Sequence, residues 1–311
     1  MIDLIYKFIG RSSLVFDCIR PLLSPGGIKK CSHTGDLSLD KTGLVVRKAN
    51  PMEILWNDSE ILFVKYDSLA HSFWRAQESS LFMRHKNLIV PPILDFGCGD
   101  GSFASSLFRE IDYGVDSNPE ALSIAEKYRI YKILLQSTNI SIPVEEAVVR
   151  SVISNSVLEH LFDLDTILSE INRILMKDGI FIFTVPVINF KYYVKKYFGN
   201  TASDQINIEY HHRNLLGIEQ WKEKLETHGF SIIKLIHYQP DWFTFWYRMF
   251  RLFGERGLGY FLPGIGIQIS KQFKPLIVNM VRKSINETVQ GANIFVVAKK
   301  DKIIKPYLDY A

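Results

Sequence analysis

The stretch "ILDFGCGDGSFASSLF", residues 93–108, limits the fold more than any other feature of the sequence. An apolar run ends in an acid, three alternating glycines follow (Gly97, Gly99 and Gly101), and a helical pattern then begins. Such glycines let the backbone turn sharply between a strand and a helix and approach a ligand closely. The stretch therefore predicts a strand–turn–helix unit with a nucleotide-like ligand at the turn.

Strand and helix patterns alternate along the chain, which predicts an α/β protein with a mostly parallel sheet covered on both faces. With 47% hydrophobic and 23% charged residues, the composition is typical of a folded protein. Strands are expected at 92–97, 112–116, 131–137, 148–155, 180–187, 231–238 and 292–300. Helices are expected at 66–87, 101–110, 118–129, 157–179 and 217–230, the fourth of them closed by Gly179.

Acids around the turn indicate what it binds. Asp95 precedes the glycines, Asp100 lies among them, and Asp116 ends the second expected strand, where it can accept hydrogen bonds from ribose hydroxyls. A dinucleotide brings a pyrophosphate, which carboxylates repel, and the spacing G-x-G-x-G differs from G-x-G-x-x-G. S-adenosylmethionine has no phosphate and carries a sulfonium and an ammonium group, so the acids favour it over NAD. Asp95 as a turn residue and Asp116 as a helix cap remain the alternatives.

Three blocks of the sequence resemble motifs of class I S-adenosylmethionine-dependent methyltransferases, most closely the type 11 subgroup. They are "ILDFGCGDGSFA", "GVDSNPEALSIA" and "ISNSVLEHLFDLDTILSEINRILMKDGIFIFTVP", within roughly 91–186. The resemblance implies a Rossmann-like, doubly wound sheet of seven strands, mostly parallel with an antiparallel last strand. It also implies that the cofactor is S-adenosylmethionine, with the methionyl part at the glycine turn and the ribose at Asp116. The expected cofactor-binding residues are Asp95, Gly97, Cys98, Gly99, Asp116, Ser117, Thr138 and Asn155.

The segment before the fourth strand, "STNISIPVEEAVVRS", departs from the family pattern. Thr138 stands near the acid expected to bind the adenine amino group, and Val149–Arg150 replace a Phe–Asp pair. We therefore expect an atypical adenine edge, at which Thr138 or Asn139 still reaches the base.

A catalytic base is expected just after the fourth strand. If the methyl acceptor is a hydroxyl, a base helps to remove its proton. The candidates are Glu159 and His160 in "VLEH" and the pair His211–His212, and position favours His160. Alternatively, His160 only packs at a helix start. Glu159 and His160 are two adjacent metal-ligand types without a third in view, so no metal site is predicted.

Residues 240–290 form an insertion between the last two strands that is rich in aromatic and basic residues. Such segments commonly lie in a membrane interface, which favours a cap that touches anionic lipid and admits a lipid-linked acceptor. The alternative is a cap that adds to the core or forms a dimer surface. Helix 66–87 is either a lid over the cofactor, with His71, Trp74 and Arg75 near the pocket, or a core helix.

The domain organisation follows from these elements. We expect an N-terminal extension with a helix and a small hairpin at 1–66, a methyltransferase domain at 67–300 and a tail at 301–311. The three cysteines are far apart and indicate no disulfide framework, and no signal peptide or membrane span is predicted. The expected location is therefore the cytoplasm, either free or at the inner membrane surface.

These observations favour methyl transfer, with oxygen as the preferred target, to a small or lipid-linked acceptor. A polysaccharide-precursor sugar or a quinone-like ring would fit. The alternatives are a non-catalytic scaffold that kept the fold, or an NAD-dependent oxidoreductase. Nucleic acid is disfavoured as a partner because the net charge is only +4 and the fourth strand ends in "SNSV" instead of an Asn-Pro-Pro-Tyr type tetrapeptide.

Overall fold

The computed structural model describes residues 38–39, 45–46, 54–57, 62–64, 69–138, 141–254, 274–286 and 288–302. The chain divides into two units, 1–48 and 49–311. In the first, β1 (Ser38–Leu39) pairs antiparallel with β2 (Val45–Val46). The helix expected in the N-terminal extension and the tail beyond 302 fall outside the described residues.

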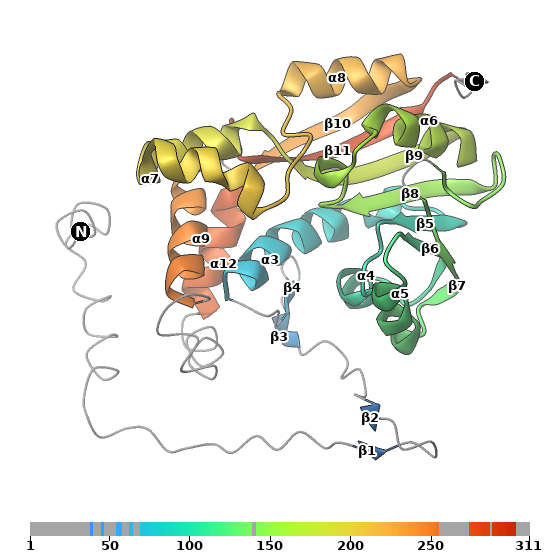
Figure 1. Cartoon of the computed structure of the whole chain (residues 1–311), viewed down its shortest axis with the longest axis horizontal. Coiled ribbons are helices and arrows are strands. Elements are labelled where there is room, and N and C mark those ends of the chain that lie inside the picture. The colour runs from blue at the N-terminus through green and yellow to red at the C-terminus, as the bar shows by residue number, and fades with distance from the viewer. Residues whose placement is uncertain are drawn as a thin grey trace. The chain divides into compact units, whose positions relative to one another are not determined.

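One seven-stranded sheet forms the centre of the second unit, in the order β10-β11-β9-β8-β5-β6-β7 (Figure 1). All neighbouring pairs are parallel except those of β11, which runs antiparallel to both β9 and β10. This confirms the predicted doubly wound sheet with an antiparallel last strand. The strands are β5 (Ile93–Phe96), β6 (Ile111–Asp116), β7 (Tyr131–Gln136), β8 (Val149–Asn155), β9 (Leu175–Pro186), β10 (Phe230–Tyr238) and β11 (Asn293–Lys300).

Two hydrophobic clusters cover the two faces of the sheet, and successive strand residues contribute to them in turn. In β11, Phe295 and Val297 join one cluster while Ile294 and Val296 join the other. Strands buried on both faces consist of continuous runs of apolar residues, so they could be predicted from the sequence. The carboxyl ends of β5, β6, β8 and β9 then meet at one edge of the sheet.

The cluster that includes Ile294 and Val296 is completed by α6 (Leu164–Ile174) and α8 (Ile218–Thr227). The helix predicted at 157–179 is wrong in its bounds. Asp163 caps α6 by accepting the backbone N–H of Thr166 at 3.0 Å. The chain enters β9 at Leu175, opposite Val149, so Gly179 lies within a strand. The segment before the cap contains only a 3-10 turn, η4 (Leu158–His160).

The other face is covered by α3 (Leu69–Arg84), α4 (Ser102–Leu107), α7 (Ile188–Glu209), α9 (Asp241–Gly254) and α12 (Lys274–Asn286). Helix α7, which the sequence did not predict, is kinked at Gly199. Helix α5 (Pro119–Ala125) follows β6, and the short turns η2 (Lys86–Leu88) and η3 (Glu126–Tyr128) complete the helical elements described. β3 (Ile54–Asn57) and β4 (Leu62–Val64) form a separate antiparallel ribbon.

Helix α3 is a core helix. The sequence had predicted either this or a lid over the cofactor. Phe73, Trp74, Leu81 and Phe82 are all buried. The ring of Trp74 lies 4.7 Å from that of Tyr247 in α9, and Phe73 stacks on Phe250 of the same helix at 5.2 Å.

The described part of the insertion also packs inward. Arg248 and Arg251 of α9 both form ion pairs with Glu209 of α7, at 2.7 and 3.4 Å. Phe243 is 1% exposed and meets Phe73 edge to face. These contacts support the alternative in which the insertion adds to the core. No helix among the described residues is both long and apolar enough to cross a membrane.

Candidate active site

The glycine turn follows β5 at the carboxyl edge of the sheet. Gly97, Gly99 and Gly101 all have positive φ angles, between 54° and 76°, a region that side chains disfavour. A Cβ atom on Gly97 would lie 2.4 Å from Val157 Cγ2, whereas one on Gly99 would meet nothing within 4 Å. Gly97 therefore allows close packing inside the protein, and Gly99 leaves open space at the surface of the turn.

Asp116 links the turn to the end of β6. Its Oδ2 accepts the backbone N–H of Gly99 at 2.8 Å, and its Oδ1 accepts that of Asn118 at 2.8 Å. A carboxylate oxygen has two lone pairs, so each can still accept a ligand hydroxyl. The helix-cap alternative for Asp116 is wrong, because Asn118 caps α5 by accepting the N–H of Glu120 at 2.9 Å.

Asp95 lies beneath the turn and is 6% exposed. The hydroxyl of Tyr131 donates to its Oδ2 at 2.7 Å. Burial raises the pKa of Asp95 to about 7, and the nearby carboxylate of Asp116 adds to the rise. Burial also raises the pKa of the Cys98 thiol, which therefore stays protonated.

The predicted adenine edge is open. Ser117 and Thr138 are both exposed, and the backbone N–H of Thr138 donates to Ser141 O at 3.3 Å. The carbonyl of Ser117 accepts from Gln136 Nε2 at 3.2 Å. Asn139 lies outside the described residues.

A fully buried carboxylate, Glu78 of α3, ties this helix to the ends of three strands. It accepts five hydrogen bonds, from Trp74 (2.8 Å), Arg75 (2.6 Å), Asn155 (3.0 Å), Ser156 (2.7 Å) and Tyr238 (3.2 Å), and the hydroxyl of Thr184 lies 3.5 Å away. Burial alone would raise the pKa of Glu78, but Arg75 and the donors from Ser156 and Asn155 outweigh burial and lower it. Glu78 is therefore an ionised anchor under the site.

The same contacts settle where the side chain of Asn155 points. Its Nδ2 donates to Glu78, and its Oδ1 accepts from the hydroxyl of Thr184 at 2.7 Å. The side-chain amide of Asn155 is thus held by Glu78 and Thr184.

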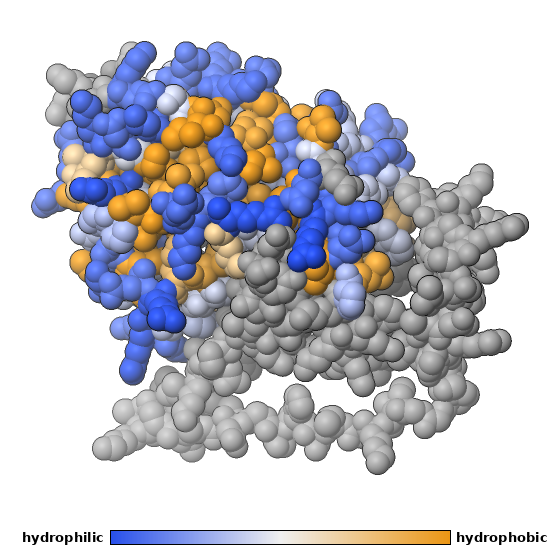
Figure 2. Space-filling model, turned by 180° about the vertical axis from the view of Figure 1, so that it is seen from behind, coloured by the Kyte–Doolittle hydropathy of each residue, from blue (hydrophilic) through white to orange (hydrophobic). Residues whose placement is uncertain are grey.

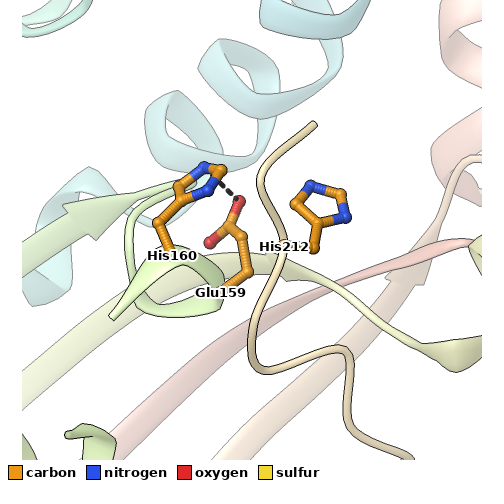
Figure 3. Close-up of side chains that lie close together, drawn as sticks. All are labelled: Glu159, His160 and His212. Carbon is orange, nitrogen blue, oxygen red and sulfur yellow. Dashed lines mark ion pairs between the residues drawn. The ribbon is translucent and has the colours of Figure 1, made fainter. Parts of the chain in front are cut away.

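Glu159, His160 and His212 form a second group beside this edge (Figure 3). One ligand-type atom from each lies within 4.8 Å of the others. His160 Nε2 is 3.7 Å from Glu159 Oε1, and His160 Nδ1 contacts the carbonyl of His211 at 3.2 Å. We call this group the Glu159–His160–His212 cluster.

Burial sets the protonation of the cluster. It raises the pKa of Glu159 to about 8, and it lowers the pKa of His212 to about 3. Burial also lowers the pKa of His160, although its side chain is 42% exposed. Both imidazoles are therefore neutral at pH 7.

Backbone hydrogen bonds hold the two segments of the cluster together. The N–H groups of Arg213 and Asn214 both donate to the carbonyl of Glu159, at 2.7 and 2.9 Å. The side-chain amide of Asn214 donates to Leu158 O and Leu161 O, at 3.0 and 2.7 Å. Two candidates that the sequence left as alternatives, His160 and His212, are thereby brought together, whereas the neighbouring His211 is exposed.

A separate surface cleft of about 330 Å³ lies at the other end of the strands. It is lined by Arg150 and Ser151 of β8 and by Gly179 and Ile180 of β9. These residues are near the amino ends of the paired strands, so the cleft is remote from the glycine turn.

Residues 94–183 match the model of a family described as a methyltransferase domain. Among solved structures, the chain is similar to geranyl diphosphate C-methyltransferase from Streptomyces coelicolor A3(2), crystallised with Mg²⁺, geranyl diphosphate and S-adenosyl-L-homocysteine. The identity is 14% over 75% of this chain and 82% of that chain, with a TM-score of 0.50. A possible histamine N-methyltransferase from Thermotoga maritima is 16% identical over 75% of this chain and 92% of that chain, with a TM-score of 0.48. No curated protein matches the sequence.

The family match spans β5 to most of β9, including the glycine turn and Asp116. The chain therefore contains an S-adenosylmethionine-dependent methyltransferase domain, in residues 94–183. It has the type 11 domain that its motifs indicated, and S-adenosylmethionine is its cofactor. The match decides against the NAD-dependent alternative.

The residues of the methyltransferase at the turn fit this cofactor. Gly99 leaves open space, Asp116 keeps lone pairs for hydroxyl groups, and two carboxylates lie where a cation is favoured. Sequence reasoning missed Tyr131 and Glu78, which position Asp95 and the end of β8. A glutamate on a helix is usually exposed, so only its place among apolar neighbours could have pointed to Glu78.

Proposed function

We propose that this methyltransferase methylates an oxygen atom of a small or lipid-linked acceptor, and that the acceptor binds beside the Glu159–His160–His212 cluster. Val157 carries the argument, because its side chain packs against Gly97 and it directly precedes η4. The cluster thus begins two residues from a contact with the cofactor turn. A polysaccharide-precursor sugar or a quinone-like ring offers the required hydroxyl.

For the cofactor, we propose the residues predicted from the motifs. Asp116 would accept hydrogen bonds from the ribose hydroxyls, and Asp95 would favour the positive charge of the methionyl part. The backbone of Gly97, Cys98, Gly99 and Asn155 would face the methionyl part, with Ser117 and Thr138 toward the adenine. S-adenosylmethionine supplies a methyl group on a sulfonium, and transfer to a hydroxyl oxygen leaves a thioether and releases the hydroxyl proton.

His160 is the proposed acceptor of that proton. A carbonyl can only accept, so the contact with His211 O fixes the proton of His160 on Nδ1 and leaves a lone pair on Nε2. Its lowered pKa keeps the ring neutral and able to act as a base at pH 7. Its 42% exposure keeps it within reach of an acceptor.

Exposed apolar side chains beside the cluster support an acceptor with an apolar part. Phe162 is 72% exposed, and the guanidinium carbon of Arg213 lies 3.5 Å from the centroid of its ring. Ile208, at the end of α7, is 76% exposed. Figure 2 shows one face of the molecule, where hydrophobic residues are interspersed with hydrophilic ones in the part not drawn in grey.

Contact of the insertion with anionic membranes stays a prediction, which liposome flotation at low salt checks.

Methyl transfer from labelled S-adenosylmethionine into a fractionated host extract tests the proposal. Label in a lipid, saccharide or quinone fraction, stable to conditions that cleave methyl esters, is the expected result. His160→Gln should lower the rate by about 10²-fold and leave S-adenosylhomocysteine binding unchanged. His211→Asn is the matched control, since its side chain is exposed and asparagine tolerates the positive φ there. Label only on nitrogen or carbon would contradict the proposal.

A further inference from the structure

We propose that the Glu159–His160–His212 cluster binds a divalent transition-metal cation of the Zn²⁺ type. The cluster offers one carboxylate and two imidazoles whose ligand-type atoms already lie within 4.8 Å of one another. This set suits zinc and its neighbours in the first row, whereas Mg²⁺ prefers oxygen ligands. In Figure 3 the side chains of Glu159 and His160 from η4 and of His212 from the loop after α7 lie around a common region.

The orientation of His160 matches that of a metal ligand. Imidazoles that bind metals usually donate their other ring N–H to a carbonyl or carboxylate, which fixes the tautomer. His160 Nδ1 makes this contact with His211 O at 3.2 Å. Its Nε2, at 3.7 Å from Glu159 Oε1, is the nitrogen left for a cation.

Two buried polar atoms of the cluster are unsatisfied among the described residues, and this is an independent observation. Glu159 Oε2 and His212 Nδ1 are both inaccessible to solvent and have no hydrogen-bond partner. Glu159 itself is 2% exposed. Buried polar atoms without partners are rare in folded proteins, and a cation that replaces the proton of Glu159 would give this carboxylate a counter-charge. Such a cation would also give partners to the two buried atoms.

The surrounding contacts hold this geometry in advance. The hydrogen bonds from Arg213 and Asn214 to the carbonyl of Glu159 fasten the loop of His212 to η4. The nearby cation Arg75 is neutralised by its ion pair with Glu78 at 2.6 Å. Arg75 and Glu78 act on Glu159 in opposite directions, so this ion pair does not replace a counter-charge for the cluster.

Three protein ligands leave at least one coordination position for another oxygen. This inference rests on the proposed function in placing the acceptor there, and it changes the role of His160 from base to ligand. A hydroxyl of the acceptor bound to the cation would lose its proton more readily, with the proton passing to water and the electron pair staying on oxygen. The oxygen then forms the new bond to the methyl carbon as the bond from sulfur to that carbon breaks. Phenolic, enolic or sugar hydroxyls are the acceptor class that suits such a site.

Titration of the chelator-treated full chain with Co²⁺, followed by visible absorption, tests the site directly. We expect one tightly bound equivalent, displaced by Zn²⁺ and not by Mg²⁺. Glu159→Gln, His160→Gln and His212→Gln should each weaken binding at least about tenfold. His211→Asn should bind as the unaltered chain does. Circular dichroism and S-adenosylhomocysteine binding show which variants remain folded. Because His160 is half-exposed, the His160→Gln variant should fold and can test the site even if a variant at a buried position does not fold.

Absence of a stoichiometric Co²⁺ site, displacement by Mg²⁺, or unchanged binding in a folded His160→Gln protein would overturn the inference. These results leave the proposed methyl transfer standing, because they are read without acceptor. Conversely, a bound Co²⁺ without any transfer of label to oxygen would contradict the proposed function and leave the metal site in place.

Discussion

Val157 occupies the space that any side chain at position 97 would need. The separation of 2.4 Å between Val157 Cγ2 and a hypothetical Cβ on Gly97 is far below van der Waals contact. This pair brings the end of β8 against the glycine turn after β5. The cofactor side and the proposed acceptor side of the site therefore share one packing contact.

Gly97→Ala should destabilise the protein by about 2–5 kcal/mol, because it adds this overlap to the strain of a positive φ. Gly99→Ala is the matched variant, since its φ is also positive but its Cβ would meet open space. We expect it to lower the free energy of unfolding by only about 1–2 kcal/mol and to impair S-adenosylhomocysteine binding instead. Urea denaturation and calorimetry separate the two effects, and equal destabilisation by both variants would contradict this assignment.

Asp116→Ala should weaken S-adenosylhomocysteine binding about 10–100-fold, through loss of hydrogen bonds to the ribose hydroxyls. Asp116→Asn keeps one acceptor and should have a smaller effect. Glu120→Ala, on exposed α5, is the control and should bind normally. Isothermal calorimetry measures all three, and unchanged affinity in Asp116→Ala would remove this residue from the proposed site.

Asp95 should make stability depend on pH in a defined direction. Its pKa is about 7 in the folded chain against an ordinary value of 3.8, so the folded state holds its proton more tightly than the unfolded state. Its contribution is complete below about pH 4 and is lost as the pH rises through 7, by up to about 4 kcal/mol. The difference in unfolding free energy between the unaltered chain and Asp95→Asn should follow this course. A flat difference between pH 4 and 8 would contradict it.

The same carboxyl group should couple cofactor binding to proton release. A positively charged cofactor favours the ionised form of Asp95, so affinity should rise from pH 6 to pH 8. Calorimetry with S-adenosylmethionine in two buffers of different ionisation enthalpy counts the released protons. Asp95→Asn should release fewer, and an equal count in both proteins would place this proton elsewhere.

Glu78→Gln should destabilise the protein by about 3–5 kcal/mol, because it leaves Arg75 without its buried counter-charge and turns an amide donor toward other donors. Ser156→Ala removes a single donor and should lower the free energy of unfolding by about 1 kcal/mol. Thermal and urea unfolding give the comparison, with Glu120→Gln as an exposed control. A Glu78→Gln protein as stable as the control would show that the anchor is dispensable.

The sheet and the cofactor turn were predictable because their signals are local. Buried strands read as apolar runs, and glycines with positive φ stand out between a strand and a helix. Helix 157–179 was predicted too long because its apolar period continues past Ile174, where pairing of Leu175 with Val149 determines the structure. The sequence of helix α7 shows no clear helical period of apolar residues, so this helix was not predicted.

The acceptor side depends on contacts between distant segments. His212 joins Glu159 and His160 through the hydrogen bonds of Arg213 and Asn214 and the contact of His160 with His211 O, more than fifty residues along the chain. No spacing in the sequence reports such a contact. The ionised state of Glu78 likewise depends on Asn155 and Ser156 at the end of β8, which are distant from it in the sequence.

The position of Glu78 has a consequence for how the molecule can be divided. The recognisable domain begins at residue 94, yet the acid that fastens the end of β8 comes from the preceding helix. A fragment cut at the family boundary would begin without that acid and would uncover the apolar rings of α9 that rest on α3. We therefore expect a fragment that folds to need α3 as well as the domain at 94–183.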